Sequence, residues 1–367
     1  MENYVIKQAC LVDGRVVDIL VEQGIIKKIA PFIETDVKQI SFGTDFVSAG
    51  WIDMHTHCFD KFETYGDQAD LVGYRQGVCT VIDAGTAGCN TIDEFYQQAI
   101  NAKTRVYSLL NIACTGIFAQ NELADTNRLK ADGIKIACQK YSDFIIGIKA
   151  RMSKTVLGDS GNSPLIFAKE VQKELKMPLM VHIGSAPSVL EDIVALLEQG
   201  DIITHIFNPK INGIKKGNEI KECIYQAIAK GIYLDLGHGT DSFSFDVAKL
   251  ALTNGIKADT ISSDIYFRNR INGPVYNLAT TMTKLLAIGY PLVEVIEKVT
   301  KRPAQIMRLD QLGTIEIGKI ADFTIFKLEN KEVELIDSTK QIVNYHQKIV
   351  PTKVIVKDQI YDLGKEK

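Results

Sequence analysis

Eight short, almost continuously apolar runs, separated by helix-length segments, are the feature that most constrains how this chain can fold. The runs are FVSAGWIDMH, CTVIDAGT, RVYSLLNIACTG, FIIGIKAR, PLMVHIGS, DIITHIFN, IYLDLGHG and TISSDIYF. Strands that are buried on both faces give such runs, whereas half-exposed strands alternate. The segments between them, such as SVLEDIVALLEQG, are amphipathic, and several end in a glycine that can follow a helix. The pattern predicts an α/β fold, a (β/α)8 TIM barrel over residues 49–309.

Both ends of the chain have a different pattern from this central region. Residues 1–48 alternate apolar and polar positions around turn signals such as Asp13-Gly14, which is typical of short antiparallel strands joined in hairpins. Short strands are again indicated over residues 310–367, in LGTIEIGKIADFTIFKLE and KIVPTKVIVKDQIYDL. We therefore expect residues 1–48 and 310–367 to build one small β-sandwich domain beside the barrel.

The composition limits the class of partner. The 367 residues, 46% of them hydrophobic, suffice for a large barrel and a small second domain. A formal net charge of −3 gives no basic field for nucleic acid, and no apolar run approaches the ~20 residues of a membrane span. The first residues lack the features of a secretory signal, and the seven cysteines are scattered, as in proteins of a reducing compartment. We expect a cytoplasmic protein with a small-molecule substrate and no nucleic-acid or membrane partner; a homo-oligomer stays open.

Five of the six histidines lie at or near the carboxyl ends of the expected strands, where a barrel of this kind gathers its chemistry. Since His55 and His57 are one residue apart on an extended strand, both imidazoles point to one face and can reach one metal ion. The pair alone is a weak signal. His182 and His205 strengthen it, because each follows an apolar stretch at the end of another strand. Imidazole nitrogens suit zinc and other borderline divalent metals.

Two further residues point to a second metal ion. Asp264 lies in the eighth run and would face the same opening as His55; the alternative is a turn or helix-capping aspartate. Lys149 ends the apolar stretch FIIGIK, where burial would lower its pKa. A neutral amine can take up CO2 to form a carbamate, which can bridge two cations. The alternatives are a lysine that pairs with Asp264 without a bridge, or the rival Lys154 in the polar segment that follows.

Together these residues resemble the amidohydrolase superfamily, in particular its dihydroorotase-like and deacetylase-like metallohydrolase branch. AGWIDMHTH is similar to the first-strand signature of the family, GVCTVIDAG to its second-strand run, and GTIEIGKIADFTIF to its return into the β domain. The resemblance implies two divalent metal ions, zinc by preference, bridged by a carbamylated lysine and a hydroxide. The implied ligands are His55, His57 and Asp264 for one ion, His182 and His205 for the other, and carbamylated Lys149 between them.

The resemblance is strongest to bacterial enzymes labelled dihydroorotase or adenine deaminase by homology, in which removal of N-acetyl or O-acetyl groups from small chiral acids is the better-supported activity. Dihydroorotases follow the histidine pair with an arginine that grips the substrate carboxylate, whereas this chain continues with Cys58, Phe59 and Asp60. Many base deaminases place a glutamate after the histidine of the fifth strand, whereas His182 is followed by Ile-Gly-Ser. The first difference disfavours dihydroorotase activity, and the second disfavours deamination of adenine.

We therefore expect metal-dependent hydrolysis of an amide or ester bond in a small acylated acid, by a metal-bridging hydroxide with Asp264 as general base and then general acid. The alternatives are a cyclic amidohydrolase of the dihydroorotase kind, an adenine deaminase and, less favoured, a metal-free scaffold.

Further residues near the expected strand ends are candidates to bind the substrate: His238, Arg151, Asn208, Lys210, Tyr266, Arg268 and Asn269. His238 is the one histidine at this end without a metal role; the alternative is a histidine that orders a loop. Arg151 could pair with a substrate carboxylate or with an acidic loop residue. We expect the long polar stretch over residues 59–74 to cover the opening as a lid.

Overall fold

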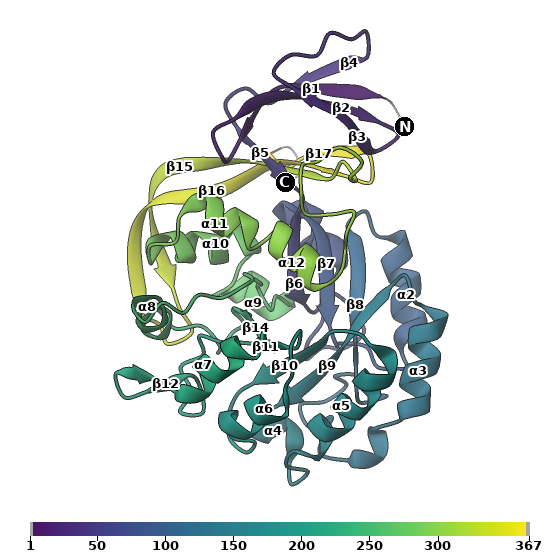
Figure 1. Ribbon diagram of the computed structural model, residues 1–367, viewed down its shortest axis with the longest axis vertical. Helices are drawn as coiled ribbons and strands as arrows, with labels where there is room; N and C mark the ends of the chain where they lie inside the picture. The colour runs from purple at the N-terminus through teal and green to yellow at the C-terminus, as the bar shows by residue number, and fades with distance from the viewer. Residues whose placement is uncertain (1–2, 365–367) are drawn as a thin grey trace.

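The computed structural model describes residues 3–364, which form a helix-covered parallel sheet with a second sheet at one end (Figure 1). Within the described residues, no helix is long and apolar enough to cross a membrane.

The parallel sheet has seven strands, and each one pairs with the next along the chain. Its strands are β6 (Trp51–Thr56), β7 (Val78–Ala84), β8 (Arg105–Asn111), β9 (Ile145–Met152), β10 (Leu179–Ile183), β11 (Ile202–Thr204) and β14 (Tyr233–Asp235). Every residue of β6 and β7 is buried, because helices cover one face of the sheet and side chains fill the other. This burial explains why these strands appear in the sequence as continuous apolar runs.

The eighth predicted strand is not a regular strand, so the prediction of a complete (β/α)8 barrel is corrected. Residues 260–265 form one isolated parallel bridge to each edge of the sheet, Asp235–Thr260 and Thr56–Ile265. Asp264 has a φ of 50°, which takes the backbone out of the extended conformation. Side chains partly replace the ladder: the Ser263 N–H donates to the Asp53 carboxylate over 3.0 Å. This region therefore has seven regular parallel strands, and one irregular segment bridges its two edge strands, β6 and β14.

Helices lie on the outside of this sheet (Figure 1). In α2, Ile92, Phe95 and Ala99 are buried at helical spacing, and the Phe95 ring stacks on Phe59 with centroids 4.9 Å apart. The helices are α1 (Ala69–Val72), α2 (Ile92–Asn101), α3 (Ala131–Lys140), α4 (Lys154–Leu157), α5 (Ser163–Leu175), α6 (Leu190–Leu196), α7 (Glu222–Ala229), α8 (Phe245–Thr253), α9 (Phe267–Asn272), α10 (Leu278–Ala287), α11 (Leu292–Glu297) and α12 (Lys301–Ile306). Two 3-10 turns, Tyr74–Gln76 and Thr126–Arg128, and the small hairpin β12 (Lys215–Lys216) and β13 (Glu219–Ile220) complete this part.

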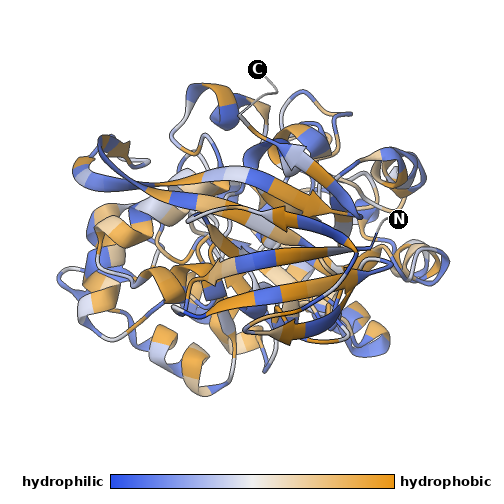
Figure 2. Ribbon diagram, turned by 90° about the horizontal axis from the view of Figure 1, so that it is seen from above, coloured by the Kyte–Doolittle hydropathy of each residue, from blue (hydrophilic) through white to orange (hydrophobic). Residues whose placement is uncertain are grey.

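Strands from both chain ends build one second sheet, in the order β17-β16-β15-β5-β1-β2-β3, with β4 paired to β1. Its strands are β1 (Tyr4–Leu11), β2 (Val16–Glu22), β3 (Ile25–Ala30), β4 (Lys38–Ser41), β5 (Phe46–Ala49), β15 (Phe323–Ile336), β16 (Ile342–Val356) and β17 (Gln359–Asp362). Hydrophobic and hydrophilic residues are interleaved along these strands (Figure 2). Ile6, Ile19 and Phe323 share one apolar cluster, which joins the two ends. The two ends thus combine as expected, but in one continuous hydrogen-bonded sheet rather than in the two sheets of the expected sandwich.

The hairpin of β15 and β16 extends well beyond this sheet. Its strands have 14 and 15 residues, longer than the short strands that the sequence predicted. The Ile349 N–H donates to the Thr283 hydroxyl of α10 over 3.2 Å. At the tip, the Asp337 carboxylate accepts from the N–H of Phe245 at the start of α8 over 2.9 Å. The hairpin therefore ties the second sheet to two helices of the parallel-sheet region.

Candidate metal centre and substrate pocket

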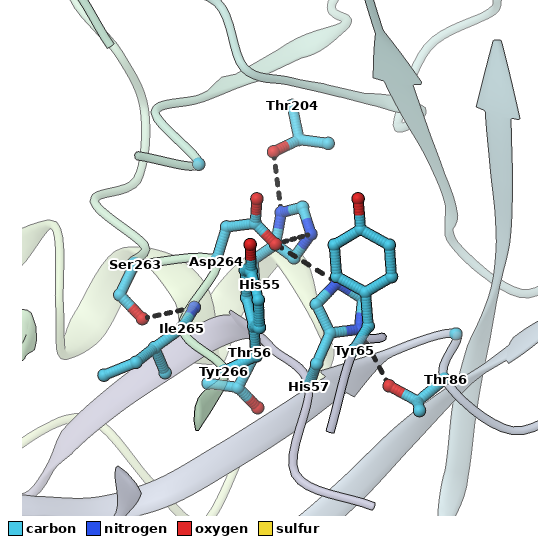
Figure 3. Close-up of polar contacts among 12 residues, drawn as sticks. His55, Thr56, His57, Tyr65, Thr86, Thr204, Ser263, Asp264, Ile265 and Tyr266 are labelled. Atoms are coloured by element: carbon cyan, nitrogen blue, oxygen red, sulfur yellow. Dashed lines mark hydrogen bonds and ion pairs between the residues drawn. The ribbon is translucent and has the colours of Figure 1, made fainter. Parts of the chain in front are cut away.

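Asp264 lies against the histidines of β6 at the carboxyl end of the parallel sheet (Figure 3). Its Oδ1 is 3.1 Å from His57 Nε2 and 3.3 Å from His55 Nε2, and its Oδ2 is 3.9 Å from His205 Nε2. Burial alone would raise the pKa of the Asp264 carboxyl, but the hydrogen bond with His57 and the nearby His205 hold that pKa below its usual value. A carboxylate with several imidazole nitrogens around it is a suitable donor set for a divalent cation.

The remaining two predicted ligands lie in the same cluster. The Nζ of Lys149, on β9, is 3.1 Å from His55 Nε2 and 3.3 Å from Met180 Sδ. The ring of His182, on β10, lies 4.3 Å from the ring of His205. Burial lowers the pKa of Lys149 to about 7, so a large share of the amine is neutral near pH 7. Lys154, the rival candidate, is exposed on α4.

The hydrogen bond of Nδ1 indicates which imidazole nitrogen carries the proton. His205 Nδ1 lies 2.6 Å from the Gly237 carbonyl, which can only accept, so we assign the proton to Nδ1. The buried His205 Nε2 has no hydrogen-bond partner among the described residues. Burial is the main cause that lowers the pKa of His205 to about 4, and it also places the pKa of His182 well below the usual value. Neutral rings with lone pairs facing one centre are the form that binds a metal.

A threonine and a buried aspartate orient His55 in the same way. His55 Nδ1 lies 2.9 Å from Thr204 Oγ1, and the Thr204 hydroxyl donates to Asp235 over 2.7 Å. Since the Thr204 hydroxyl donates its proton to Asp235, its oxygen accepts a hydrogen bond from His55 Nδ1–H. His55 Nε2 is then the nitrogen without a proton. His57 Nδ1 lies 2.7 Å from Thr86 Oγ1 (Figure 3).

The ligand atoms of His55, His205 and Asp264 lie within 4.8 Å of one another. This spacing fits a divalent cation, and so does His205 Nε2, which has no hydrogen-bond partner among the described residues.

We expect Thr204→Val to weaken metal binding, because it removes the acceptor that holds His55 with Nε2 toward the centre. Losses of this kind cost about 10- to 100-fold in metal affinity. Competition with a chelator and metal analysis would measure the change. Thr260→Val is the matched control, because the Thr260 hydroxyl also donates to Asp235 over 2.7 Å but does not contact His55. Equal metal affinity in the two variants would contradict the role of Thr204.

A pocket of about 100 Å³ opens above this cluster. Its floor includes all of the predicted ligands except His205, and its wall is formed by Tyr65, Gln120, Arg151, Ser153, Thr155, Lys210, Thr240, Asp241, Ser242 and Tyr266. Tyr65 packs on His57 with ring centroids 5.5 Å apart and on Tyr266 at 5.0 Å. The Asp67 carboxylate binds Arg270 of α9 over 2.6 Å, which ties this loop down. Tyr65 of the polar stretch 59–74 therefore lines the pocket, and a lid formed by this stretch stays a prediction.

Arg151, Lys210 and Tyr266 are the three predicted substrate-binding residues that line the pocket. Arg151 Nη1 donates to both carboxylate oxygens of Glu122, over 3.2 and 3.3 Å, and its guanidinium lies 5.1 Å from the Tyr65 ring. Glu122 is fully buried. The charge of Arg151 is thus compensated inside the protein. Of the two partners predicted for Arg151, the structure shows the acidic loop residue. Sequence reasoning missed Glu122, because its segment (AQNEL) carries no motif.

The other four predicted substrate-binding residues do not line this pocket. One of them, Asn269, donates to the Asp264 carbonyl over 2.9 Å. His238 Nε2 accepts from buried Lys284 over 2.7 Å, and its Nδ1 contacts the Gly239 carbonyl, so this ring orders its surroundings. The Asn208 amide donates to the His205 carbonyl over 2.8 Å and accepts from the Lys210 N–H over 3.1 Å. Arg268 is exposed on α9 beside a separate hollow. Among these, Asn208 still bears on the site, because it shapes the loop that follows a ligand histidine.

Comparison with known proteins adds three findings. The model of the amidohydrolase family matches residues 46–361. The chain is 51% identical over 366 residues to a protein from Enterococcus faecalis named deacetylase, covering 98% of this chain and 99% of that protein. It is 50% identical, with a TM-score of 0.97, to a solved structure described as an adenine deaminase, covering 99% and 100% of the two chains, and 31% identical, with a TM-score of 0.91, to one described as a dihydroorotase, covering 99% and 98%.

Proposed function

This chain belongs to the amidohydrolase family and is a hydrolase, and from that premise we propose that it is a metal-dependent deacetylase acting on a small N-acetyl or O-acetyl acid. The observation that carries the proposal is the cluster in which buried His205 Nε2, 3.9 Å from Asp264 Oδ2, has no hydrogen-bond partner among residues 3–364. Two similar proteins named deacetylase, at 51% and 33% identity, support the choice of bond.

We propose two divalent cations, zinc by preference, at this cluster. One would be held by His55, His57 and Asp264, the other by His182 and His205, with Lys149 as a carbamate between them. Bound cations of this kind lower the pKa of water toward neutrality and polarise a carbonyl oxygen. The domain that carries this chemistry would span residues 49–309, with the chain ends, 1–48 and 310–367, forming the supporting β domain.

Asp264 would move the proton of the reaction. Its Oδ1 lies at the floor of the pocket, where it can accept a proton from the attacking water and then donate that proton to the leaving amine or alcohol. The Asn269 amide donates to the Asp264 carbonyl over 2.9 Å, and the Asp264 N–H donates to the His55 carbonyl over 2.7 Å, so the backbone is fixed on both sides. Tyr65 and Tyr266 would limit water in the pocket and orient the acyl group.

The second candidate is a cyclic amidohydrolase or an adenine deaminase, since similar solved structures are described as a dihydroorotase and an adenine deaminase. Two features disfavour it. Cys58 and Phe59, which follow the histidine pair, are both buried, so no arginine enters the pocket from there. Arg151, which does line the pocket, is already paired with Glu122.

A substrate screen with zinc-loaded enzyme tests the proposal. We expect acetate release from N-acetyl amino acids or O-acetyl hydroxy acids, with a preference for one hand, and little turnover of cyclic ureides or adenine. Dialysis against a chelator should abolish the activity, and zinc with bicarbonate should restore it. Metal analysis should give about two ions per active chain, the number that this proposal requires. Efficient deamination of adenine, or full activity in metal-free protein, would overturn the proposal.

A further inference from the structure

Lys210 is a cationic side chain of the pocket wall whose charge the protein does not compensate. For its ammonium, the structure records no hydrogen bond or ion pair with any of residues 3–364. The other two cationic side chains of the pocket differ from it. Arg151 is paired with the buried carboxylate of Glu122. Lys149 lies on the floor against His55 and has its pKa lowered to about 7 by burial.

The backbone around Lys210 is held in one conformation relative to His205. The Asn208 side chain donates to the His205 carbonyl and accepts from the Lys210 N–H. The Lys210 carbonyl accepts from the Gly213 N–H over 2.8 Å. A turn with these internal hydrogen bonds holds the Cα of Lys210 in place, so less backbone conformational entropy is lost when a ligand binds there.

Lys210 lies on the His182 and His205 side of the cluster. Lys210 and His182 line the same pocket, and the Asn208 side chain connects the Lys210 N–H to the His205 carbonyl. Asp264 Oδ2 lies 3.9 Å from His205 Nε2, and Asp264 lines the same pocket as Lys210. A molecule with an anionic end at Lys210 would therefore have its other end over the proposed proton carrier.

We propose that Lys210 binds the carboxylate of the substrate and thereby selects acylated acids over neutral acyl amides. This inference rests on the proposed deacetylase function and specifies its substrate class as an acyl group on a small monocarboxylic acid. Arg151 is the weaker candidate for the same role, because its net charge is cancelled by Glu122. Asp241, an exposed acid on the same wall, would repel a second carboxylate.

The test compares Lys210→Met with wild-type enzyme on N-acetylalanine and on its neutral counterpart N-acetylalaninamide, using both hands of each. Since a hydrogen bond to a charged group contributes about 1.5–3 kcal/mol, we expect kcat/KM for the acid to fall by about 10- to 100-fold, mainly through KM. We expect kcat/KM for the amide to be unchanged. Lys216→Met, which removes an exposed lysine of the β12–β13 hairpin, should change neither. Equal losses on acid and amide, or no loss on either, would overturn the role of Lys210.

A binding experiment separates this inference from the proposed function. If wild-type enzyme hydrolyses no acylated compound, the deacetylase proposal fails, and lactate and lactamide then serve as probes of zinc-loaded protein in thermal-shift titrations. We expect lactate to stabilise the wild type more than lactamide does, and we expect this difference to vanish in Lys210→Met. A difference that persists in the variant would show that the carboxylate binds elsewhere and that Lys210 is a solvated wall residue.

Discussion

Asp264→Asn will keep the fold and bound metal but lose about two to four orders of magnitude in kcat. General acid–base catalysis contributes about 10²- to 10⁴-fold, and an amide cannot accept the proton from water. Asparagine has the same shape and retains an oxygen that can face His55 and His57. Its backbone is also fixed independently of the carboxylate, by Asn269 and by the His55 carbonyl. Steady-state kinetics on the best acylated acid, with metal analysis of the same sample, would measure the effect.

Gly239 shows how closely the chain packs around that carboxylate. A Cβ on Gly239, whose φ is +56°, would lie 2.4 Å from Asp264 Oδ2, so only glycine fits there. Because the asparagine side chain has the same shape as that of aspartate, it meets no new contact at Gly239. Asp159→Asn, at an exposed site, is the control for the chemical change alone. A near-wild-type rate in metal-loaded Asp264→Asn would contradict the proposed proton transfer.

The positions of the clustered histidines could be predicted from the sequence because these residues lie at or next to strand ends. A strand buried on both faces leaves a continuous apolar run, and the residue that ends the run lies where parallel strands converge. His55 and His182 are the last residue but one of β6 and of β10, and His205 directly follows β11, whereas β9 continues for three residues beyond Lys149. Asp264 does not follow this rule, since it lies in a polar segment (TISSD) that forms no regular strand. In place of a ladder, the Ser263 hydroxyl donates to Asp53 and the Ser262 hydroxyl donates to Asp235.

The substrate-binding residues were harder to predict, because their surroundings depend on contacts between distant segments. Arg151 meets Glu122 across 29 positions, and His238 meets Lys284 across 46. No sequence pattern near Arg151 or His238 predicts that Glu122 or Lys284 is the partner. The same holds for the long hairpin of β15 and β16, whose outer half, residues 330–347, lies outside the short strands that the sequence predicted. It is ordered by pairing between its two strands and by contacts with α8 and α10, which lie 92 and 66 positions earlier in the chain.

Lys149→Met will abolish measurable deacetylation and reduce bound metal from about two ions per chain to at most one, the outcome expected if a carbamate of Lys149 bridges two cations. Burial at this place holds the pKa of Lys149 at about 7, so the neutral amine that reacts with CO2 is abundant near pH 7. Methionine has a similar length and suits the apolar part of the site, where Met180 already contacts the amine. Metal analysis and kinetics of zinc- and bicarbonate-treated protein would measure both changes.

Lys154→Met is the matched control, because this lysine lies five residues further along the chain but is exposed on α4 and should change neither metal content nor rate. Mass spectrometry under native conditions should show one added CO2 on wild-type protein and none on Lys149→Met. If Lys149→Met kept two metal ions and its activity, the bridging role would be wrong. The low pKa of Lys149 would then reflect only burial, and its contact with His55 would serve to position that ring rather than to carry a ligand.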